Sequence, residues 1–296
     1  MAKNILHMIT PLAHMSPFDV NMALDAGYDA TASYTNVSLE EVEGLVQDAM
    51  FSRSPRDATR TGVFIGGKDA LVALDMLDAA GKALFKPFEI SLFADPAGSF
   101  TTAAAMIAVV KKTLREKKDR ALRGAAVSVF GATGVVGTAS AVIAALEGAS
   151  VTLVGREGTE RTSRHASEVG RRFGVNLAVA DGSSTEAKAA ILRDTEVILC
   201  AAKAGVRVID AAEFANAQKL LIAADVNAVP PSGIEGVDAQ ANGTPLGEHG
   251  ALGIGALAIG NVKYRTESGL FKQMTESKTP LRLDFRQAFA LARTLV

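Results

Sequence analysis

The stretch AAVSVFGATGVVGTASAVIAALEGASVTLVGR, residues 125–156, contains the clearest structural pattern in this chain of 296 residues. A short run rich in β-branched residues leads into the glycine loop GATGVVG (131–137), which is followed by an apolar segment of helical length and by a second β-like run, SVTLV (150–154). Strand, glycine loop, helix and strand in this order open a doubly wound α/β sheet of the Rossmann type. The second half of the chain is therefore predicted to form such a sheet.

The glycine loop has the spacing G-x-x-G-x-x-G rather than the commoner G-x-G-x-x-G. Gly131 permits a tight exit from the strand, Gly134 lets the backbone approach a pyrophosphate, and Gly137 lets the helix lie close to the sheet. The helix N-terminus then offers N–H groups to phosphates. Because the loop lies between a predicted strand and a predicted helix, we expect it to bind a dinucleotide.

The choice between NAD and NADP is expected at the end of the second strand, which reads Gly155-Arg156-Glu157. An arginine at this place accepts the 2′-phosphate of NADP, whereas a carboxylate holds the ribose of NAD. Arg156 favours NADP and Glu157 is compatible with NAD, so both cofactors stay open. The residues predicted to bind the cofactor are Gly131, Ala132, Thr133, Gly134, Val135, Val136, Gly137, Gly155, Arg156, Ala201, Ala202, Lys203 and Asn227.

Outward from this stretch, short apolar runs alternate with longer amphipathic segments, as in repeated βα units with mainly parallel strands. In the first half we expect strands near 3–9, 29–34, 60–65 and 88–93 and helices near 17–27, 38–51, 68–85 and 99–117. Ser38 and Glu41 have the spacing of a capping box for the second helix. In the second half we expect strands at 125–130, 150–154, 175–180, 196–201 and 219–224.

A charged segment that ends in glycine, KKTLREKKDRALRG (111–124), is typical of a solvated helix end at a domain junction. From Gly247 the pattern becomes glycine-rich, then helical, then LRLDF and a last helix from Asp284. We therefore predict two doubly wound α/β domains: residues 1–120 with about 262–296, for substrate and oligomer contacts, and residues 121–261, for NAD(P). By analogy with other two-domain nucleotide enzymes, the C-terminal helical segment is expected to return to the first domain.

Composition excludes several classes of function. Lys and Arg (31) balance Asp and Glu (32), so no net field favours nucleic acid or an anionic membrane. The single cysteine, Cys200, excludes an intramolecular disulfide, and we expect it to be a small buried residue. The four histidines, His7, His14, His165 and His249, lack metal-ligand spacing, which predicts no metal site. The N-terminal apolar run is too short for a signal peptide or a membrane span, so a cytoplasmic location is expected.

The sequence shows no obvious general acid or base. It contains neither a G-x-S-x-G elbow nor a Tyr-x-x-x-Lys pair. Four polar clusters follow predicted strands, where open α/β sheets bind ligands: SPFDVN (16–21), FIGGKD (64–69), DPAGSFTTAAA (95–105) and ADVNAVPPSGIEG (224–236). The lack of an obvious general acid or base is compatible with the class of hydride transfer that needs neither.

Long phrases of the sequence resemble the NAD(P)-dependent methylene-tetrahydromethanopterin dehydrogenases of methylotrophic bacteria. They are HMITPLAHMSPFDVNMALDAGY (7–28), RTGVFIGGKDALVALDM (60–76), FADPAGSFTTAAAM (93–106), the GATGVVG loop, ADVNAVPPSGIEGVD (224–238) and GIGALAIGNVKY (253–264). The resemblance is greatest to members that accept both NAD and NADP, although Arg156 is a departure that resembles the NADP-restricted members.

This resemblance implies oxidation of 5,10-methylene-tetrahydromethanopterin to the methenyl form by direct hydride transfer to NAD(P), in formaldehyde oxidation, by a homo-oligomer. Asp19 and Asp95 are then candidates to orient the pterin or to stabilise its cation. The candidate substrate-binding residues are Asp19, Asp95, Ser99, Thr101, Thr102, Asn227 and Lys263. For Lys263 and its neighbour Tyr264, a purely structural role is an equal alternative.

Three other functions stay open at this point. A methylene-tetrahydrofolate dehydrogenase would share the cofactor and the chemistry. A shikimate-dehydrogenase-like enzyme would use Lys68 with an aspartate for proton transfer. A redox-sensing regulator would bind NAD(P)H without turnover, although no basic patch for DNA is evident.

Overall fold

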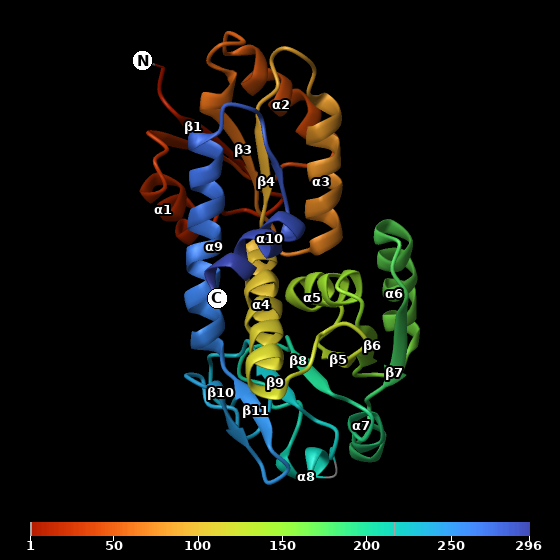
Figure 1. Ribbon diagram of the computed structural model, residues 1–296. Helices are drawn as coiled ribbons and strands as arrows, with labels where there is room; N and C mark the ends of the chain where they lie inside the picture. Colours follow the sequence, from red (N-terminus) through yellow and green to blue (C-terminus); the bar gives the residue numbers. More distant parts are fainter. Residues whose placement is uncertain (1, 216) are drawn as a thin grey trace. The chain divides into compact units, whose positions relative to one another are not determined.

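A computed structural model describes residues 2–215 and 217–296 of the chain (Figure 1). Contacts between Cα atoms divide it into two compact units. The first unit comprises Met1–Thr101 and Tyr264–Leu291, and the second comprises Thr102–Lys263 and Ala292–Val296. Each unit is built on its own sheet.

The first unit contains a parallel sheet with the strand order β12-β4-β3-β1-β2. Helices α2 and α3 pack side by side on one face, and α1 lies on the other with the part of α9 that belongs to this unit (Figure 1). The central strand β3 is buried at every position, as expected where helices cover both faces. The strands are β1 (Ile5–Ile9), β2 (Ala30–Tyr34), β3 (Thr61–Ile65), β4 (Ser91–Ala94) and β12 (Arg282–Leu283), and the helices are α1 (Pro17–Asp25), α2 (Val42–Phe51), α3 (Ala70–Ala83) and, shared with the second unit, α4 (Ser99–Lys118), α9 (Ala256–Glu276) and α10 (Phe285–Leu295).

Aromatic rings fix the C-terminal segment on the first unit. Phe271 of α9 lies 5.4 Å from Phe64 of β3 and 5.2 Å from Phe93 of β4, between ring centroids. At the start of α10, Phe285 lies 5.3 Å from Phe100. Tilted and edge-to-face ring contacts of this kind combine large buried area with a defined geometry. The predicted return of the C-terminal helical segment to the first domain is thus confirmed.

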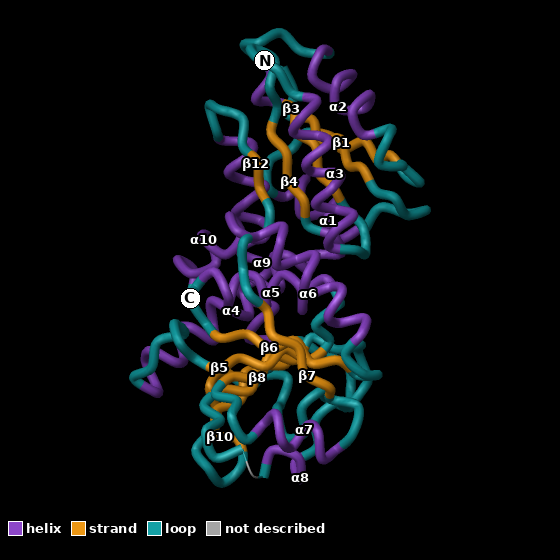
Figure 2. Tube along the Cα trace, turned by 90° about the vertical axis from the view of Figure 1, so that its right-hand side faces the viewer, coloured by secondary structure: helices purple, strands orange, loops and turns teal. Residues whose placement is uncertain are grey.

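The second unit contains a sheet with the strand order β10-β11-β9-β8-β5-β6-β7, in which only β10 is antiparallel to its neighbour among the described strands. Helices α5 and α6 lie on one face and α7 and α8 on the other (Figure 2). The strand order reverses at β5, which is the switch point of a Rossmann sheet. The strands are β5 (Ala126–Phe130), β6 (Ser150–Gly155), β7 (Leu177–Asp181), β8 (Val197–Cys200), β9 (Ile222–Asp225), β10 (Asn242–Leu246) and β11 (Ala251–Ile254), and the helices are α5 (Val135–Leu146), α6 (Glu160–Phe173), α7 (Thr185–Leu192) and α8 (Ala211–Phe214).

The predicted fold class, two doubly wound α/β sheets of which the second is of the Rossmann type, is confirmed. Two details differ from the prediction. The edge strand β10 and its neighbour β11 were not expected, and α2 begins at Val42 rather than at residue 38. Residues 38–41 close as a turn instead, because the Ser38 N–H donates to Glu41 at 2.7 Å while the Ser38 hydroxyl bonds Glu40.

Among the described residues, no helix is both long and apolar enough to span a bilayer. Cys200 is buried at the end of β8, as expected, and burial raises the pKa of its thiol to about 12.

Candidate functional site

The glycine loop of the second unit connects β5 to α5, and its first glycine is required by the fold itself. Gly131 has a φ of 72°, a left-handed conformation that favours glycine. A Cβ at this position would lie 2.4 Å from the carbonyl oxygen of Ala201, which begins the loop after β8. The backbone that leaves β5 at Gly131 therefore lies in close contact with the loop after β8.

The other two glycines of the loop differ from each other. A Cβ on Gly137 would lie 2.3 Å from the Gly131 oxygen, so the first turn of α5 sits directly on the loop. A Cβ on Gly134 would have only that same oxygen as a neighbour, at 3.3 Å. The protein's own packing thus requires glycine at 131 and 137, whereas a Cβ at 134 would meet a single backbone oxygen in a tight but less severe contact.

The N-terminus of α5 fits a phosphate group. Gly134 is its N-cap residue, and in the described chain no side chain caps this end. The first-turn N–H groups, from Val135 to Gly137, have no acceptor within the helix. An anion placed here would accept these N–H groups and face the positive end of the helix dipole. A residue without a side chain at 134 and the first-turn N–H donors beside it together suit the pyrophosphate of a dinucleotide.

Thr138, in the first turns of α5, connects the N-terminal end of this helix to the glycine loop and to α6. Its hydroxyl donates to the Ala132 carbonyl at 3.3 Å and lies 2.8 Å from Nε2 of His165 on α6. Thr138 is buried, so these contacts fix the loop relative to the next helix.

At the end of β6, Arg156 and Glu157 project into solvent. Their side chains are 85% and 83% exposed, and Arg156 Nε lies 3.5 Å from a Glu157 carboxylate oxygen. An exposed pair of this kind contributes little to stability and is easily rearranged by a ligand.

The neighbouring Asp181 was not predicted as a site residue. Bonds from the Ser183 side chain and backbone and from the Gly158 backbone lower the pKa of its carboxyl.

The loop after β8 begins where the Ala201 N–H donates to Phe130 of β5 at 2.9 Å. Ala201 and Ala202 are half-buried beside the glycine loop, and Lys203 is exposed. The structure thus places Ala201 and Ala202 next to Gly131, and Lys203 follows them in the same loop.

Asn227, in the loop after β9, uses its amide inside the protein. Its Oδ1 accepts the Gly205 N–H at 3.2 Å and the Val229 N–H at 2.9 Å, and its Nδ2 donates to the Pro231 carbonyl at 2.9 Å. Asn227 therefore ties the loops after β8 and β9 together, and its contact with a ligand stays a prediction. The buried carboxylate of Asp225 organises the same loop; it lies in the quoted cluster 224–236 but was not singled out.

In the first unit, the loops after β1, β3 and β4 meet at the carboxyl edge of the sheet. A Cβ on Gly67 would lie 3.6 Å from Pro11 and 3.9 Å from Pro96, and one on Gly66 would lie 3.3 Å from Met15. The topology thus brings three of the predicted polar clusters to one edge, as open α/β sheets do at ligand sites.

Asp95 lies fully buried beneath the start of α4. One carboxylate oxygen accepts the N–H groups of Phe100 (2.7 Å) and Thr101 (3.3 Å), and the other accepts the Thr101 hydroxyl at 2.6 Å. A carboxylate with these bonds caps the helix and suits its dipole. The geometry gives Asp95 and Thr101 a structural task, whatever role they have toward a substrate.

The other predicted polar residues lie at different depths. Asp19 is buried in the first turn of α1, where its N–H donates to Ser16 at 3.3 Å. Ser99 and Thr102 on α4 and Lys263 on α9 are half-buried. Lys68 is exposed, and the neighbouring Asp69 is engaged as the cap of α3, accepting N–H groups from Leu71 and Val72.

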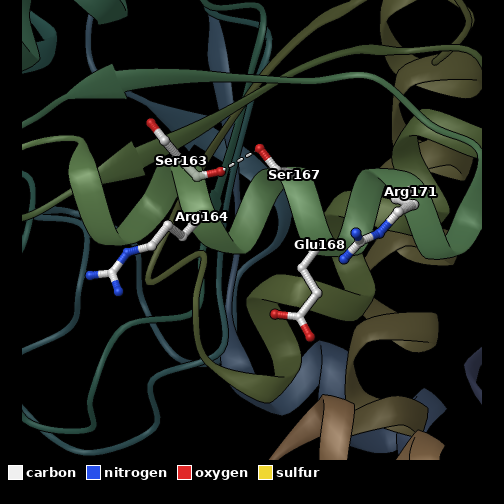
Figure 3. A pocket seen from close by; sticks show the side chains of 5 residues that line it. All are labelled: Ser163, Arg164, Ser167, Glu168 and Arg171. Carbon is white, nitrogen blue, oxygen red and sulfur yellow. Dashed lines mark hydrogen bonds between the residues drawn. The ribbon is translucent and has the colours of Figure 1, made fainter.

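A depression of about 620 Å³ lies along one face of α6 (Figure 3). It is lined by Ser163, Arg164, Ser167, Glu168 and Arg171. These side chains follow helical spacing, and the Ser167 hydroxyl donates to the Ser163 carbonyl at 2.9 Å. None of them was predicted as a site residue. The described residues contain no group of three or more potential metal ligands.

A family model described as methylene-tetrahydromethanopterin dehydrogenase, N-terminal, matches residues 17–97. The "Bifunctional protein MdtA" of Methylorubrum extorquens AM1 is 32% identical over 295 residues, which cover the whole of both chains. The shikimate 5-dehydrogenase of Listeria monocytogenes has a TM-score of 0.53 over 99% of this chain and 96% of that one; at 14% identity it shows the fold alone.

A further relative covers nearly the full length at much higher identity. The NAD(P)-dependent methylenetetrahydromethanopterin dehydrogenase of Methylorubrum extorquens AM1 is 52% identical over 292 residues, which are 99% of this chain and 98% of that protein. The resemblance seen in the sequence is thereby confirmed, and the chain belongs to the family of NAD(P)-dependent methylenetetrahydromethanopterin dehydrogenases.

Proposed function

We propose that this chain oxidises 5,10-methylene-tetrahydromethanopterin to the 5,10-methenyl form, with NAD or NADP as the hydride acceptor, in one-carbon metabolism. The observation that carries this proposal is the 52% identity, over nearly the whole of both chains, to a dehydrogenase named for that substrate and cofactor.

The glycine loop supports the cofactor part of the proposal. In this proposal Gly134 and the first turn of α5 bind the pyrophosphate, and Arg156, which directly follows β6, binds the 2′-phosphate of NADP. When bound, the nicotinamide supplies the acceptor for a hydride. The loops that begin at Ala201 and Asp225 line the remaining part of the cofactor site.

The reaction needs no proton relay, which agrees with the residues present. The carbon that is oxidised lies between two nitrogens, whose lone pairs delocalise the cation left behind. The tasks of the protein are then to align the reactants and to exclude water. We assign the carboxyl edge of the first unit to the pterin. Asp19 orients its ring, while Asp95 holds the start of α4, from which Ser99 and Thr102 offer polar contacts.

The alternatives have less support. The geometry does not favour a proton-transferring pair of Lys68 with its neighbour, because Asp69 is engaged as a helix cap. Methylene-tetrahydrofolate differs from the methanopterin substrate in its tail, and an activity assay with each substrate distinguishes the two enzymes. A redox sensor would bind NAD(P)H and show no turnover.

Purified protein is expected to reduce NAD or NADP with methylene-tetrahydromethanopterin as substrate. The measurement is reduced-nicotinamide absorbance in four mixtures, each pterin with each cofactor. Activity with methylene-tetrahydrofolate alone would transfer the assignment to the folate enzyme. Binding of NAD(P)H without turnover in any mixture would favour the sensor.

Arg156→Ala is expected to weaken NADP binding about tenfold, because a charge-assisted bond to the 2′-phosphate is lost, and to change NAD binding by less than about twofold. Calorimetric dissociation constants measure both. The matched control is Arg164→Ala, which removes another exposed arginine of the second unit. Equal losses for NAD and NADP would remove Arg156 from the 2′-phosphate site.

Two carboxylates of the first unit are expected to respond differently to amide substitution. Asp95→Asn should lower the free energy of unfolding by about 1–3 kcal/mol, because a buried helix cap loses acceptor capacity. Asp19→Asn should lower kcat/KM for the pterin about tenfold, beyond any effect on the free energy of unfolding. Thermal unfolding and single-turnover rates separate the two. Unchanged pterin kinetics in Asp19→Asn would exclude Asp19 from the substrate site.

A further inference from the structure

The loop after β9, residues 226–234, is organised around one buried carboxylate, that of the last strand residue, Asp225. Asp225 is 1% exposed, and its two oxygens accept the N–H groups of Asn227 at 2.9 Å and of Ile234 at 3.0 Å. The Cys200 thiol and the Gly233 N–H bond it as well. A single side chain therefore holds both ends of the loop.

The chain at Gly233 passes so close to this carboxylate that a side chain has no room. A Cβ there would lie 2.7 Å from Cys200 Sγ and 3.0 Å from an Asp225 oxygen. Burial raises the pKa of the Asp225 carboxyl, which reflects the cost of keeping a charge in this place. The hydrogen bonds of this carboxylate therefore hold the two ends of the loop together, against the free-energy cost of burying a charge.

Further bonds join this loop to the loop after β8. Asn227 accepts the Gly205 N–H, and the Gly233 carbonyl accepts the N–H groups of Val208 (2.8 Å) and Ile209 (3.0 Å). The Arg207 Nε donates to the Ser232 carbonyl at 2.7 Å. The two loops, residues 201–209 and 226–234, thus form one hydrogen-bonded assembly, which we call the β8–β9 wall.

The position of the β8–β9 wall in the sheet identifies the part of the cofactor that it faces. Strand β8 pairs with β5 on the side opposite to β6, and β9 pairs with β8. A dinucleotide with its pyrophosphate at α5 and its adenosine ribose at the end of β6 extends its other half over β8 and β9. That half is the nicotinamide riboside.

We propose that Asp225 is a positioning residue for the nicotinamide half of the cofactor: it fixes the β8–β9 wall in the shape that receives this half. The inference rests on the cofactor part of the proposed function. Asp225 need not touch the cofactor, because it acts through the backbone of residues 227–234 and through Asn227.

A matched carboxylate lies at the opposite end of the same strands. Glu196 accepts the Ala126 N–H at 2.8 Å and is bonded by Arg120 at 2.9 and 3.0 Å. Ala126 is the first residue of β5. Glu196 therefore stabilises the amino ends of the strands, which lie at the opposite end from the glycine loop. Glu196→Gln therefore controls for the loss of a carboxylate that binds backbone.

The test compares ligands with and without the nicotinamide ring on the full chain. Dissociation constants are measured by calorimetry for NAD against ADP-ribose and for NADP against 2′-phospho-ADP-ribose. In Asp225→Asn, affinity for the complete dinucleotide is expected to fall about tenfold, while affinity for the ligand lacking nicotinamide changes less than about twofold. In Glu196→Gln, both affinities stay within about twofold of the parent, and only Tm falls.

Equal losses for both ligands, or no loss for either, would overturn the role of Asp225. If Asp225→Asn does not fold, Asn227→Ala serves in its place and is expected to show the same selective loss. A parent protein that binds neither dinucleotide would overturn the proposed function and this inference together, whereas normal binding with an unselective variant overturns the inference alone.

Discussion

The second unit depends on one close approach of backbone to backbone, at the start of α5. Gly137 brings the first helical turn onto the Gly131 carbonyl, and Gly131 in turn lies against the Ala201 carbonyl of the neighbouring loop. With side chains at these two positions the helix would be displaced from the sheet. Glycine at both positions keeps α5 close to the sheet. The same switch point is therefore bordered by the free N–H groups of α5, by the end of β6 and by the β8–β9 wall. The site for a dinucleotide follows from this packing.

Within each of the two units, the buried polar residues mostly position backbone rather than carry protons. Asp95 caps α4, Asn227 joins two loops, and Asp225 holds the ends of one of them. Such an arrangement suits a reaction in which the substrate stabilises its own cation and the enzyme supplies orientation. A buried carboxylate that accepts several N–H groups is costly to place but makes a loop rigid, and a rigid loop binds a ligand with a smaller loss of conformational entropy.

Much of the fold could be predicted from the sequence, because buried parallel strands produce short apolar runs between amphipathic helices. The strands from β1 to β9 lie within or close to their predicted ranges. Strand β10 was missed because NGTPL is a polar edge segment, and β11 because ALGI is short and lies among glycines. Arg156 could be placed from its distance to the glycine loop. The tasks of Asp225 and Asn227 could not, since their bonds to Ile234 and Gly205 depend on how two loops fold together.

The most direct test of the account is the binding of NAD and NADP by Gly134→Ala, measured by calorimetry beside thermal unfolding. A methyl group at 134 would lie 3.3 Å from the backbone oxygen of Gly131, which must shift by a few tenths of an ångström, so thermal unfolding separates any loss of stability from a loss of binding. The same methyl group would occupy the space that the pyrophosphate approaches, and the account predicts a loss of affinity of about tenfold or more for both cofactors. Unchanged affinity at unchanged stability would contradict the claim that this loop receives the dinucleotide.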